Sequence, residues 1–504
     1  MKVENVEMRV DYIVVQAGGK GTRLEHLTAN KPKALVPVEN LPMLFHLFRK
    51  YPDKRYVIIA DYKKEVLREY LESFAEVEYQ VVDASGGGTC GGVQQALNLL
   101  PESTPFMLIW SDLILPDDFS LPSQLRDYIG ISQTFPCRWS YKDAQLTEER
   151  SKYYGVAGLF VFQDKMSLQE IPESGELVRW MQGRGMTFQE LGLAGTREFG
   201  LLPEYEALEQ EKCRPFNKMT FDGGILIKEP IDEQGRKLAR LERRWYEAAL
   251  AKSVRNVPRL YATDPLKMER INGKNIYEYA DLPNSEKLSI LRKLTDALKD
   301  LHSLERTPTD TFSLKEAYYS KTMERLSKIR DLIPYADQET IIVNGRECRN
   351  VYYHKRRLES KLDALHCGQF SFIHGDCTFS NLMLRDNTEP VFIDPRGYFG
   401  YTELHGDPNY DWAKLYYSVV GNYDRFNLKD FRLTIEDCGV SLDITSNQWE
   451  SLEHDFFELS GTDPQEIKLI HAIIWLSLTT YAWQDYDSIC GAFYNGLYYL
   501  EEVL

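Results

Sequence analysis

The sequence has few cysteines and no excess of positive charge, and each shortage excludes a class of protein. Eight cysteines are scattered over 504 residues without a CxxC pair, so neither a zinc site built on such pairs nor a redox motif is predicted. The 60 basic residues are outnumbered by 76 acidic residues, which gives a net charge of −16. Broad electrostatic attraction to nucleic acid or anionic lipid is therefore not expected.

Long apolar runs are also missing. The longest nearly apolar stretch, residues 472–483, contains Ser477, Thr479 and Thr480 and is too short to cross a bilayer, so it predicts a buried helix. The opening segment MKVENVEMRVDY lacks the apolar core of a signal peptide. We expect a cytoplasmic protein with reduced thiols and no membrane partner.

The composition is that of a globular protein, with 43% hydrophobic and 27% charged residues. At roughly 150 residues per domain, this length predicts two or three domains. A change of pattern near residue 204 divides the chain into a first domain, 1–203, and a second domain, 204–504.

The first domain alternates between strand and helix patterns. Apolar runs lie at 12–15, 56–60, 77–82 and 105–110, and helical periodicity lies at 42–51, 63–74 and 92–100. This order predicts a Rossmann-like α/β domain with a mainly parallel sheet and helices on both faces. Ligands bind at the carboxyl ends of such strands, which directs attention to the loops after Val15 and Trp110.

The second domain begins with strands and continues with helices. Two strands at 216–220 and 225–228 flank a turn at 221–224, and a polar helix follows at 234–250. A further strand pair comes after Pro258, and a leucine-faced helix opens at Asn284. The pattern predicts two lobes, a small β-rich lobe at 204–280 and a helical lobe at 281–504, together an α+β fold.

A glycine-rich segment with cations follows the first strand. AGGKGTRL (17–24) precedes KPKALVPV (31–38) by a few residues. Glycines allow close backbone approach to a triphosphate, and Arg23 and Lys33 can neutralise its oxygens. The spacing matches neither the Walker sequence nor GxGxxG. The alternative, a plain glycine-rich turn, does not explain the cations.

These two segments resemble the signature of the sugar-phosphate and phosphocholine nucleotidyltransferases, over about residues 10–200. The resemblance implies that a substrate phosphate attacks the α-phosphorus of an NTP and that pyrophosphate leaves. It implies catalytic phosphate contacts from Arg23 and Lys33, and Mg²⁺ on Asp112, with Glu198 as the candidate second ligand. It also implies nucleotide contacts from the following residues: Ala17, Gly18, Gly19, Gly21, Thr22, and, in GGGTCGG (86–92), Gly88 and Thr89.

The strongest motif in the chain is HGDCTFSN (374–381), followed by FID (392–394). An acid, an Asn five residues later and an Asp at a strand end supply a base for a hydroxyl group and two Mg²⁺ ligands, which is kinase chemistry. The motif resembles the choline kinase and aminoglycoside phosphotransferase group, over about residues 205–504. The resemblance implies that Asp376 is the catalytic base and that Asn381 and Asp394 hold the metal.

The same resemblance implies nucleotide contacts in the small lobe. Lys228 would reach the phosphates, Glu242 would be its ion-pair partner, with Glu247 on the same helix as the alternative, and Glu269 beside Met268 would lie at the adenine. Near the catalytic motif, four residues are expected to support the structure rather than to react: His374, Asp407, Asp411 and Lys414.

The two motifs together predict consecutive reactions. The kinase would phosphorylate a small alcohol with ATP, and the first domain would couple the phosphate to a nucleotide, with CTP as the expected donor and a precursor of surface polysaccharide as the product. The alternatives are a sugar kinase joined to a sugar-1-phosphate nucleotidyltransferase, and a kinase-like domain that only binds.

Aromatic residues suggest the acceptor. Eight of them in the helical lobe can surround a quaternary ammonium group, or can simply pack in the core: Tyr410, Trp412, Tyr416, Tyr417, Trp475, Tyr481, Trp483 and Tyr486. With the acidic charge of the chain, they favour choline or a related amino alcohol over a sugar. The expected partners are thus small molecules without nucleic acid, and the existence of a homo-oligomer stays open.

Overall fold

The computed structural model describes residues 9–84, 87–206, 208 and 217–504. Contacts between Cα atoms divide the chain into two compact units, Met1–Glu211 with Gln484–Tyr486, and Lys212–Trp483 with Asp487–Leu504. Residues 209–216 lie outside the described residues, so the boundary near 204 stays a prediction. Gly86 and Phe216, which belong to predicted elements, lie outside the described residues as well.

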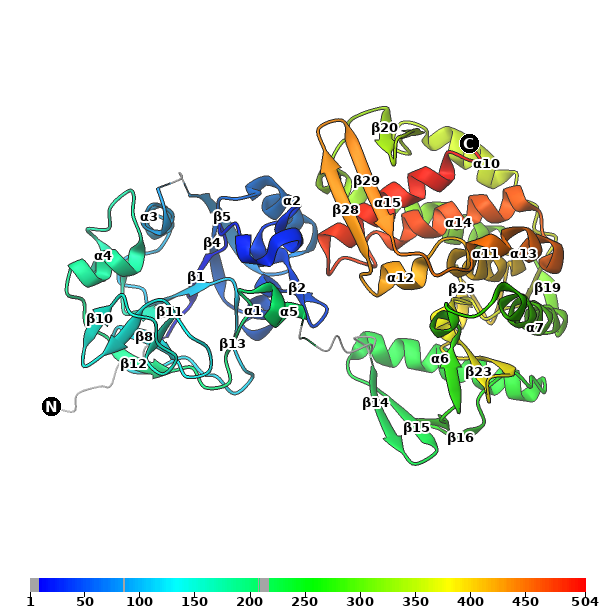
Figure 1. Ribbon diagram of the computed structural model, residues 1–504, viewed down its shortest axis with the longest axis horizontal. Coiled ribbons are helices and arrows are strands. Elements are labelled where there is room, and N and C mark those ends of the chain that lie inside the picture. The colour runs from blue at the N-terminus through cyan, green and yellow to red at the C-terminus, as the bar shows by residue number, and fades with distance from the viewer. Residues whose placement is uncertain (1–8, 85–86, 207, 209–216) are drawn as a thin grey trace. The chain divides into compact units, whose positions relative to one another are not determined.

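A nine-stranded sheet is the centre of the first unit (Figure 1). Its parallel part follows the predicted apolar runs and has the order β6-β1-β4-β5. These strands are β1 (Tyr12–Gln16), β4 (Arg55–Ala60), β5 (Glu78–Asp83) and β6 (Phe106–Trp110). Val15 is opposite both Ile58 and Ile109, and all three side chains are fully buried, because a parallel strand is covered on both faces.

Helices connect these strands as the periodicity predicts. They are α1 (Met43–Lys50), α2 (Lys64–Phe74) and α3 (Thr89–Leu97), and α3 lies over β1, β4 and β5. The helix predicted at 92–100 thus begins three residues earlier, at Thr89. α1 packs against α2 through Phe45 and Tyr70, whose ring centroids are 5.7 Å apart.

The other part of the sheet is mixed, because it contains antiparallel pairs and one parallel pair. β11 (Gly155–Phe162) runs antiparallel to β6 and to β8 (Tyr128–Ser132), and β12 (Gln189–Gly192) joins β8. No helix separates β8 from β11, and strands joined without a crossover helix pair antiparallel. Smaller elements complete the unit: β2 (Pro37–Val38), β3 (Leu41–Pro42), β7 (Leu113–Ile114), β9 (Ser140–Lys142), β10 (Gln145–Thr147), β13 (Arg197–Glu198), α4 (Leu177–Gly183) and α5 (Leu202–Glu206).

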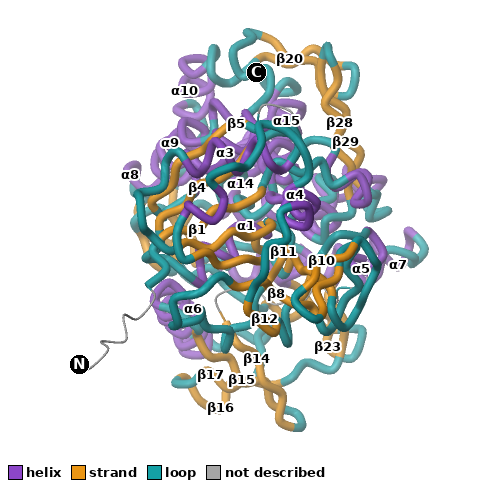
Figure 2. Tube along the Cα trace, turned by 90° about the vertical axis from the view of Figure 1, so that its left-hand side faces the viewer, coloured by secondary structure: helices purple, strands orange, loops and turns teal. Residues whose placement is uncertain are grey.

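The second unit has a small lobe with a four-stranded antiparallel sheet, in the order β14-β15-β17-β16 (Figure 2). Its elements are β14 (Asn217–Asp222), β15 (Ile225–Pro230), α6 (Glu233–Ala251), β16 (Leu260–Thr263) and β17 (Leu266–Glu269). The first hairpin turns at Gly223, whose φ of +57° suits glycine. Phe221 and Asp222, predicted in the turn, belong to β14.

The large lobe is mostly helical, as predicted. Its helices are α7 (Asn284–Ser303), α8 (Thr311–Lys315), α9 (Lys321–Lys328), α10 (Lys355–Asp363), α11 (Pro408–Val419), α12 (Tyr423–Asn427), α13 (Glu453–Ser460), α14 (Pro464–Leu478) and α15 (Tyr486–Leu500). In α7 the predicted leucine face is buried at Leu291, Leu294, Leu298 and Leu301. The helix predicted across 472–483 ends at Leu478, and the Thr479 hydroxyl donates to the Leu476 carbonyl at 2.9 Å, a bond that competes with helix continuation.

Short strands between these helices carry the catalytic motif. β22 (Gln369–Phe372) leads into HGDCTFSN, and β23 (Leu382–Arg385) pairs with β24 (Glu389–Phe392) directly after it. The remaining strands are β18 (Gly273–Asn275), β19 (Arg306–Pro308), β20 (Thr340–Val343), β21 (Arg346–Arg349), β25 (Tyr398–Phe399), β26 (Thr402–Glu403), β27 (His405–Gly406), β28 (Phe431–Glu436) and β29 (Gly439–Ile444). Among the described residues, no helix is both long enough and apolar enough to cross a bilayer.

Candidate active sites

The glycine-rich loop of the first unit leaves β1 at Gln16, at the carboxyl end of the strand. Gly21 has a φ of +63°, and a Cβ there would lie 3.0 Å from the Cβ of Lys33. A Cβ on Gly18 would lie 2.7 Å from the Cβ of Asp61. Both positions therefore require glycine, for backbone conformation in one case and for close packing in the other.

The rest of the loop is open to solvent. Ala17 is buried, and its N–H donates to the Ile59 carbonyl at 3.0 Å, whereas Gly19, Thr22 and Arg23 are exposed. Within the described part of the chain, the Arg23 side chain has no ion pair or hydrogen bond. The guanidinium group is thus available to an anion, and its contact with NTP phosphates stays a prediction.

Lys33 brings the two predicted metal ligands together. Its Nζ atom forms an ion pair with Asp112 Oδ2, and it lies 3.5 Å from the point where a Cβ on Gly200 would stand. Glu198 Oε1 lies 2.1 Å from that same point. Glu198 is in β13, opposite Leu113 in β7, so the strand pair places its carboxylate near that of Asp112.

Two observations fit a divalent cation at this acidic pair. Asp112 Oδ1 is buried and has no hydrogen-bond partner among the described residues. Burial first, and then the charges of Glu198 and Asp112, raise the pKa of the Cys137 thiol to about 12, so both carboxylates lie within electrostatic range of this thiol. The described residues contain no group of three or more His, Cys, Asp or Glu side chains arranged for a metal. Two carboxylates with open positions suit Mg²⁺, which is usually held by one or two carboxylates and by substrate phosphates.

The second glycine-rich loop is fixed by the segment before α4. Gly88 has a φ of +79°, and a Cβ there would lie 2.6 Å from the Gly175 carbonyl oxygen. The Thr89 hydroxyl accepts a hydrogen bond from the Leu177 N–H at 2.8 Å, and the Thr89 carbonyl accepts one from Gln16 Nε2 at 3.1 Å. Thr89 thus joins α3, α4 and β1, and contact of this loop with a base stays a prediction.

In the small lobe of the second unit, Lys228 contacts its predicted ion-pair partner, Glu242, and the predicted metal ligand Asp394. Its Nζ atom lies 2.8 Å from both carboxylate oxygens of Glu242 and 2.7 Å from Asp394 Oδ1. Burial opposes the charge of Lys228, but the carboxylates of Asp394 and Glu242 outweigh burial and raise its pKa. Glu247, the alternative partner, is exposed. The geometry therefore selects Glu242.

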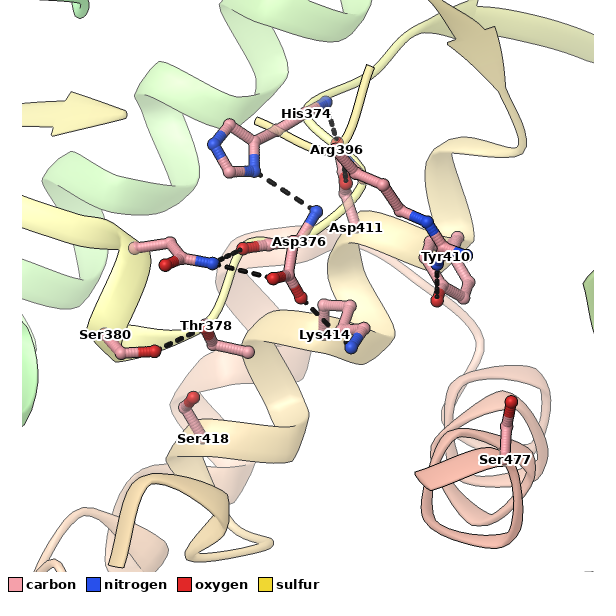
Figure 3. A network of polar contacts seen from close by, with 12 residues as sticks. His374, Asp376, Thr378, Ser380, Arg396, Tyr410, Asp411, Lys414, Ser418 and Ser477 are labelled. Carbon is pink, nitrogen blue, oxygen red and sulfur yellow. Dashed lines mark hydrogen bonds and ion pairs between the residues drawn. The ribbon is translucent and has the colours of Figure 1, made fainter. Parts of the chain in front are cut away.

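Asp376 is at the centre of the catalytic loop (Figure 3). Asn381 Nδ2 donates to Asp376 Oδ2 at 2.8 Å and to its carbonyl at 3.0 Å. Lys414 Nζ lies 3.1 Å from Asp376 Oδ1. Asp394 follows β24 with a φ of +53°, a conformation that residues other than glycine seldom adopt and that is frequent at functional sites. The carboxylates and the amide are the oxygen donors that Mg²⁺ prefers.

The loop is held from behind by Asp411 and His374, as predicted. Asp411 Oδ2 accepts from the His374 N–H at 2.8 Å, and Oδ1 accepts from the Gly375 N–H at 2.6 Å. His374 Nδ1 accepts from the Asp376 N–H at 3.2 Å, and Nε2 donates to the Ile393 carbonyl at 2.9 Å. Burial lowers the pKa of His374, so the neutral ring orients the loop. Both ring nitrogens are engaged by the backbone.

Asp407 has the contact that was predicted for it, whereas the role predicted for Glu269 is not tested by its contacts. Asp407 caps α11 by accepting from the Asn409 N–H at 3.0 Å, as predicted. Glu269 is in β17, but its carboxylate forms an ion pair with Arg385 at 2.9 Å. Any contact of Glu269 with adenine would therefore come from its backbone, and this role stays a prediction.

The aromatic residues of the large lobe are mostly in its core. Trp475 is fully buried, with ring centroids 4.7 Å from Tyr417 and 5.0 Å from Phe426, and only Tyr481 of the eight is exposed. Two of these rings, those of Tyr410 and Tyr417, already have the lysine that contacts Asp376 as a neighbour. Lys414 Nζ lies 5.3 Å from the centroid of Tyr417 and 5.9 Å from that of Tyr410. These aromatic residues therefore do not support an amino alcohol as the acceptor.

Sequence reasoning missed the contact of Lys414 with Asp376. Lys414 was expected to be a structural support, because a single Lys on an apolar helix carries no motif. The signal in the sequence was its spacing, since Tyr410 and Lys414 are one helical turn apart and both face the catalytic loop. Arg396, two residues after Asp394, was missed in the same way.

Two family models match the chain. Residues 12–131 match the model described as nucleotidyl transferase, and residues 227–431 match the model described as phosphotransferase enzyme family. The chain is thus a fusion of two group-transfer domains. The first part is similar to nucleotidyl transferases and the second part to the phosphotransferase enzyme family, which indicates a nucleotidyltransferase and a kinase.

Curated relatives match a part of the chain. The bifunctional protein GlmU of Methanocaldococcus jannaschii is 26% identical over 163 residues, which cover 32% of this chain and 36% of that protein. The mannose-1-phosphate guanyltransferase of Yarrowia lipolytica is 34% identical over 116 residues, which cover 21% of this chain and 32% of that protein. The chain thus spans about a third of the length of these relatives.

Solved structures also match a part of the chain. The CTP:phosphocholine cytidylyltransferase of Streptococcus pneumoniae is 21% identical, with a TM-score of 0.33 and coverage of 40% of this chain and 99% of that chain. The inositol-1-phosphate CTP transferase of T. maritima is 17% identical, with a TM-score of 0.34 and coverage of 39% of this chain and 92% of that chain.

Proposed function

We propose that this chain is a bifunctional enzyme that phosphorylates a small alcohol with ATP and then transfers a nucleotidyl group to the phosphorylated product. The observation that carries the proposal is that each unit has its own cation and acids in contact. In the first unit Lys33 pairs with Asp112, with Glu198 on the neighbouring strand, and in the second unit Lys228 contacts Asp394 and Glu242.

In the second unit, Asp376 takes the proton of the acceptor hydroxyl group. The hydroxyl oxygen forms a bond to the γ-phosphorus of ATP, the bond from that phosphorus to the β,γ-bridging oxygen breaks, and ADP leaves. Lys228 holds the phosphates, and Asn381 and Asp394 are the residues that would hold Mg²⁺, which neutralises phosphate charge when bound. Asn381 also orients the base through its 2.8 Å hydrogen bond to Asp376.

In the first unit, a phosphate oxygen of the substrate forms a bond to the α-phosphorus of the NTP, and pyrophosphate leaves. Two anions must meet, so positive charge has to screen them and hold them in line. Arg23 and Lys33 supply that charge from the chain. Asp112 and Glu198 are the residues that would hold Mg²⁺. When bound, the ion would neutralise negative charge on both phosphates.

The order of the two reactions follows from their chemistry. The kinase product carries the phosphate that the nucleotidyltransferase requires, so the final product is an NDP-activated alcohol. CTP is the proposed donor, because AGGKGTRL and KPKALVPV resemble the phosphocholine nucleotidyltransferases. Activated alcohols of this kind are substrates for the synthesis of surface polysaccharide, and we assign the chain to that use.

A second candidate is supported by the names of the curated relatives. Mannose-1-phosphate guanyltransferase acts on a sugar phosphate, so a sugar kinase joined to a sugar-1-phosphate nucleotidyltransferase is the alternative. A kinase-like unit that only binds is disfavoured, because Asp376, Asn381 and Asp394 are all present.

A screen of nucleotides and phosphates tests the proposal. CTP, UTP, GTP and ATP are each combined with choline phosphate, ethanolamine phosphate, glycerol phosphate and common sugar 1-phosphates, and pyrophosphate release is measured. Release with CTP and an alcohol phosphate supports the first candidate. Release with only UTP or GTP and a sugar 1-phosphate supports the second.

A further inference from the structure

A group of four basic residues lies beside the catalytic loop of the second unit, and we call it the basic cluster: Lys321, Arg325, Arg396 and Lys414. Lys321 and Arg325 are one turn apart in α9, Arg396 follows the Asp394 loop, and Lys414 is in α11. Three separate segments of the large lobe thus bring positive charge to one place.

Two tyrosines connect the cluster. Arg396 donates to the hydroxyl of Tyr410 at 2.8 Å (Figure 3). It also donates to the hydroxyl of Tyr398 at 3.0 Å. Lys321 Nζ lies 5.9 Å from the ring centroid of Tyr398, and Lys414 Nζ lies 5.9 Å from that of Tyr410. The cations therefore share the same two side chains.

The cluster adjoins the catalytic base. A Cβ on Gly375 would lie 3.0 Å from the Cβ of Arg396, and Gly375 directly precedes Asp376. Lys414 contacts Asp376 at 3.1 Å. A reacting hydroxyl must lie within about 3 Å of the base, so the remainder of a small acceptor lies near this charge.

Three members of the cluster have no acidic partner. No carboxylate oxygen of a described residue lies within 4.0 Å of a side-chain nitrogen of Lys321, Arg325 or Arg396. Arg325 donates to the Ser477 hydroxyl at 3.0 Å, so its contacts there are neutral. Burial, Arg396 and Arg325 lower the pKa of Lys321 to about 6. Glu316 acts on Lys321 and Asp376 acts on Arg396 in the opposite sense, but neither forms an ion pair there. A bound anion offsets the cost of burying these groups and favours the charged form of Lys321.

We propose that the acceptor alcohol carries an anionic group, a carboxylate or a phosphate, which Lys321, Arg325 and Arg396 bind while Asp376 takes the hydroxyl proton. This inference rests on the proposed kinase function and names its substrate class. Guanidinium groups bind carboxylate and phosphate through paired hydrogen bonds. The reaction is the phosphoryl transfer described above, with the anionic group unchanged. A cationic amino alcohol would instead be repelled by the cluster.

The acceptor class is tested with matched sets of alcohols and the full-length chain. ATP consumption is measured with glycerol, glycerate and glycerol 3-phosphate, with glucose, gluconate and glucose 6-phosphate, and with choline and ethanolamine. We expect kcat/KM at least about tenfold higher for a charged member than for its neutral parent, the scale of one charge-assisted interaction. The carboxylate and phosphate arms distinguish the two anions. Equal or better turnover of a neutral or cationic alcohol overturns the inference and leaves the kinase standing. Turnover of no alcohol contradicts the proposed function as well.

A substitution in the cluster tests its role. Lys321→Met is expected to raise KM for the anionic acceptor by about tenfold or more, with KM for ATP unchanged, and Lys321→Arg is expected to keep most of the affinity. Lys328→Met, which changes an exposed residue of the same helix, is the matched control. If Lys321→Met raises KM for ATP and leaves that of the acceptor unchanged, the cluster binds nucleotide and the inference is wrong. Circular dichroism confirms that each variant folds.

Discussion

At the scale of single residues, the two sites share one arrangement: a lysine pairs with each important carboxylate. Lys33 pairs with Asp112, and Lys414 pairs with Asp376. A lysine so placed offers positive charge to an incoming phosphate. Removing the acid therefore leaves a cation without its partner as well as removing a ligand or a base.

Asp376→Asn tests the division of labour between the units. The amide keeps the shape of the side chain but accepts no proton, so phosphorylation of the acceptor should fall by about 10² or more. Pyrophosphate release from a supplied phospho-substrate should persist. Asp437→Asn, which changes an exposed acid of the same unit, is the control. Loss of both activities in a folded variant would show that the units do not act separately.

Asp112→Ala tests the acidic pair of the first unit. Without this carboxylate the charge of the two phosphates is not screened, and nucleotidyl transfer should fall below detection while the kinase activity stays. Asp118→Ala, at an exposed acid, should leave both activities unchanged. If Glu198→Gln transfers nucleotide normally, Glu198 is not the second metal ligand, and another acid must hold that position.

Arg23→Lys tests whether the exposed guanidinium group binds phosphate. An ammonium group does not reproduce a bidentate contact, so kcat/KM for nucleotidyl transfer should fall by about tenfold or more. Arg126→Lys, also at an exposed position of the first unit, serves as the control. Equal kinetics of the two variants would show that Arg23 is only a solvated cation.

At the scale of elements, α11 positions the kinase site. Its first turn is capped by Asp407, and it presents Asp411 to the backbone of the catalytic loop and Lys414 to the base. The motif on the loop could be predicted from sequence, because its residues are adjacent in the chain. The contacts made by α11 could not, since they depend on how a helix some 30 residues later packs on that loop.

Asp411→Ala should weaken this element. Two buried backbone N–H groups, those of His374 and Gly375, would lose their acceptor, a loss of about 3 kcal/mol for hydrogen bonds to a charged group. Scanning calorimetry should show a lower unfolding temperature for the second unit only, together with a lower kcat. Asp443→Ala, at an exposed acid, is the control. An unchanged transition would mean that the loop is held by other contacts.

At the scale of the whole molecule, the chain joins a nucleotidyltransferase domain to a phosphotransferase domain. The alternation of strands and helices predicted the parallel half of the first sheet. In that half a helix lies between each apolar run and the next, and such a crossover makes the strands parallel. The antiparallel half was not predicted, since short strands such as β9 and β10 have little periodicity. The basic cluster was not predicted either, because its members come from three segments that only tertiary packing brings together.

The most direct test of the central claim follows both reactions in one sample by phosphorus NMR. The full-length chain is mixed with Mg²⁺, ATP, CTP and the acceptor that gives the highest ATP turnover. We expect a phosphate monoester first and then a diphosphate diester, with ADP and pyrophosphate as the other products. Omission of CTP should stop the sequence at the monoester, and Asp376→Asn should form the diester only when the monoester is supplied. Diester formation by Asp376→Asn from the unphosphorylated alcohol, or a monoester that the wild-type chain never consumes with any NTP, would contradict the account.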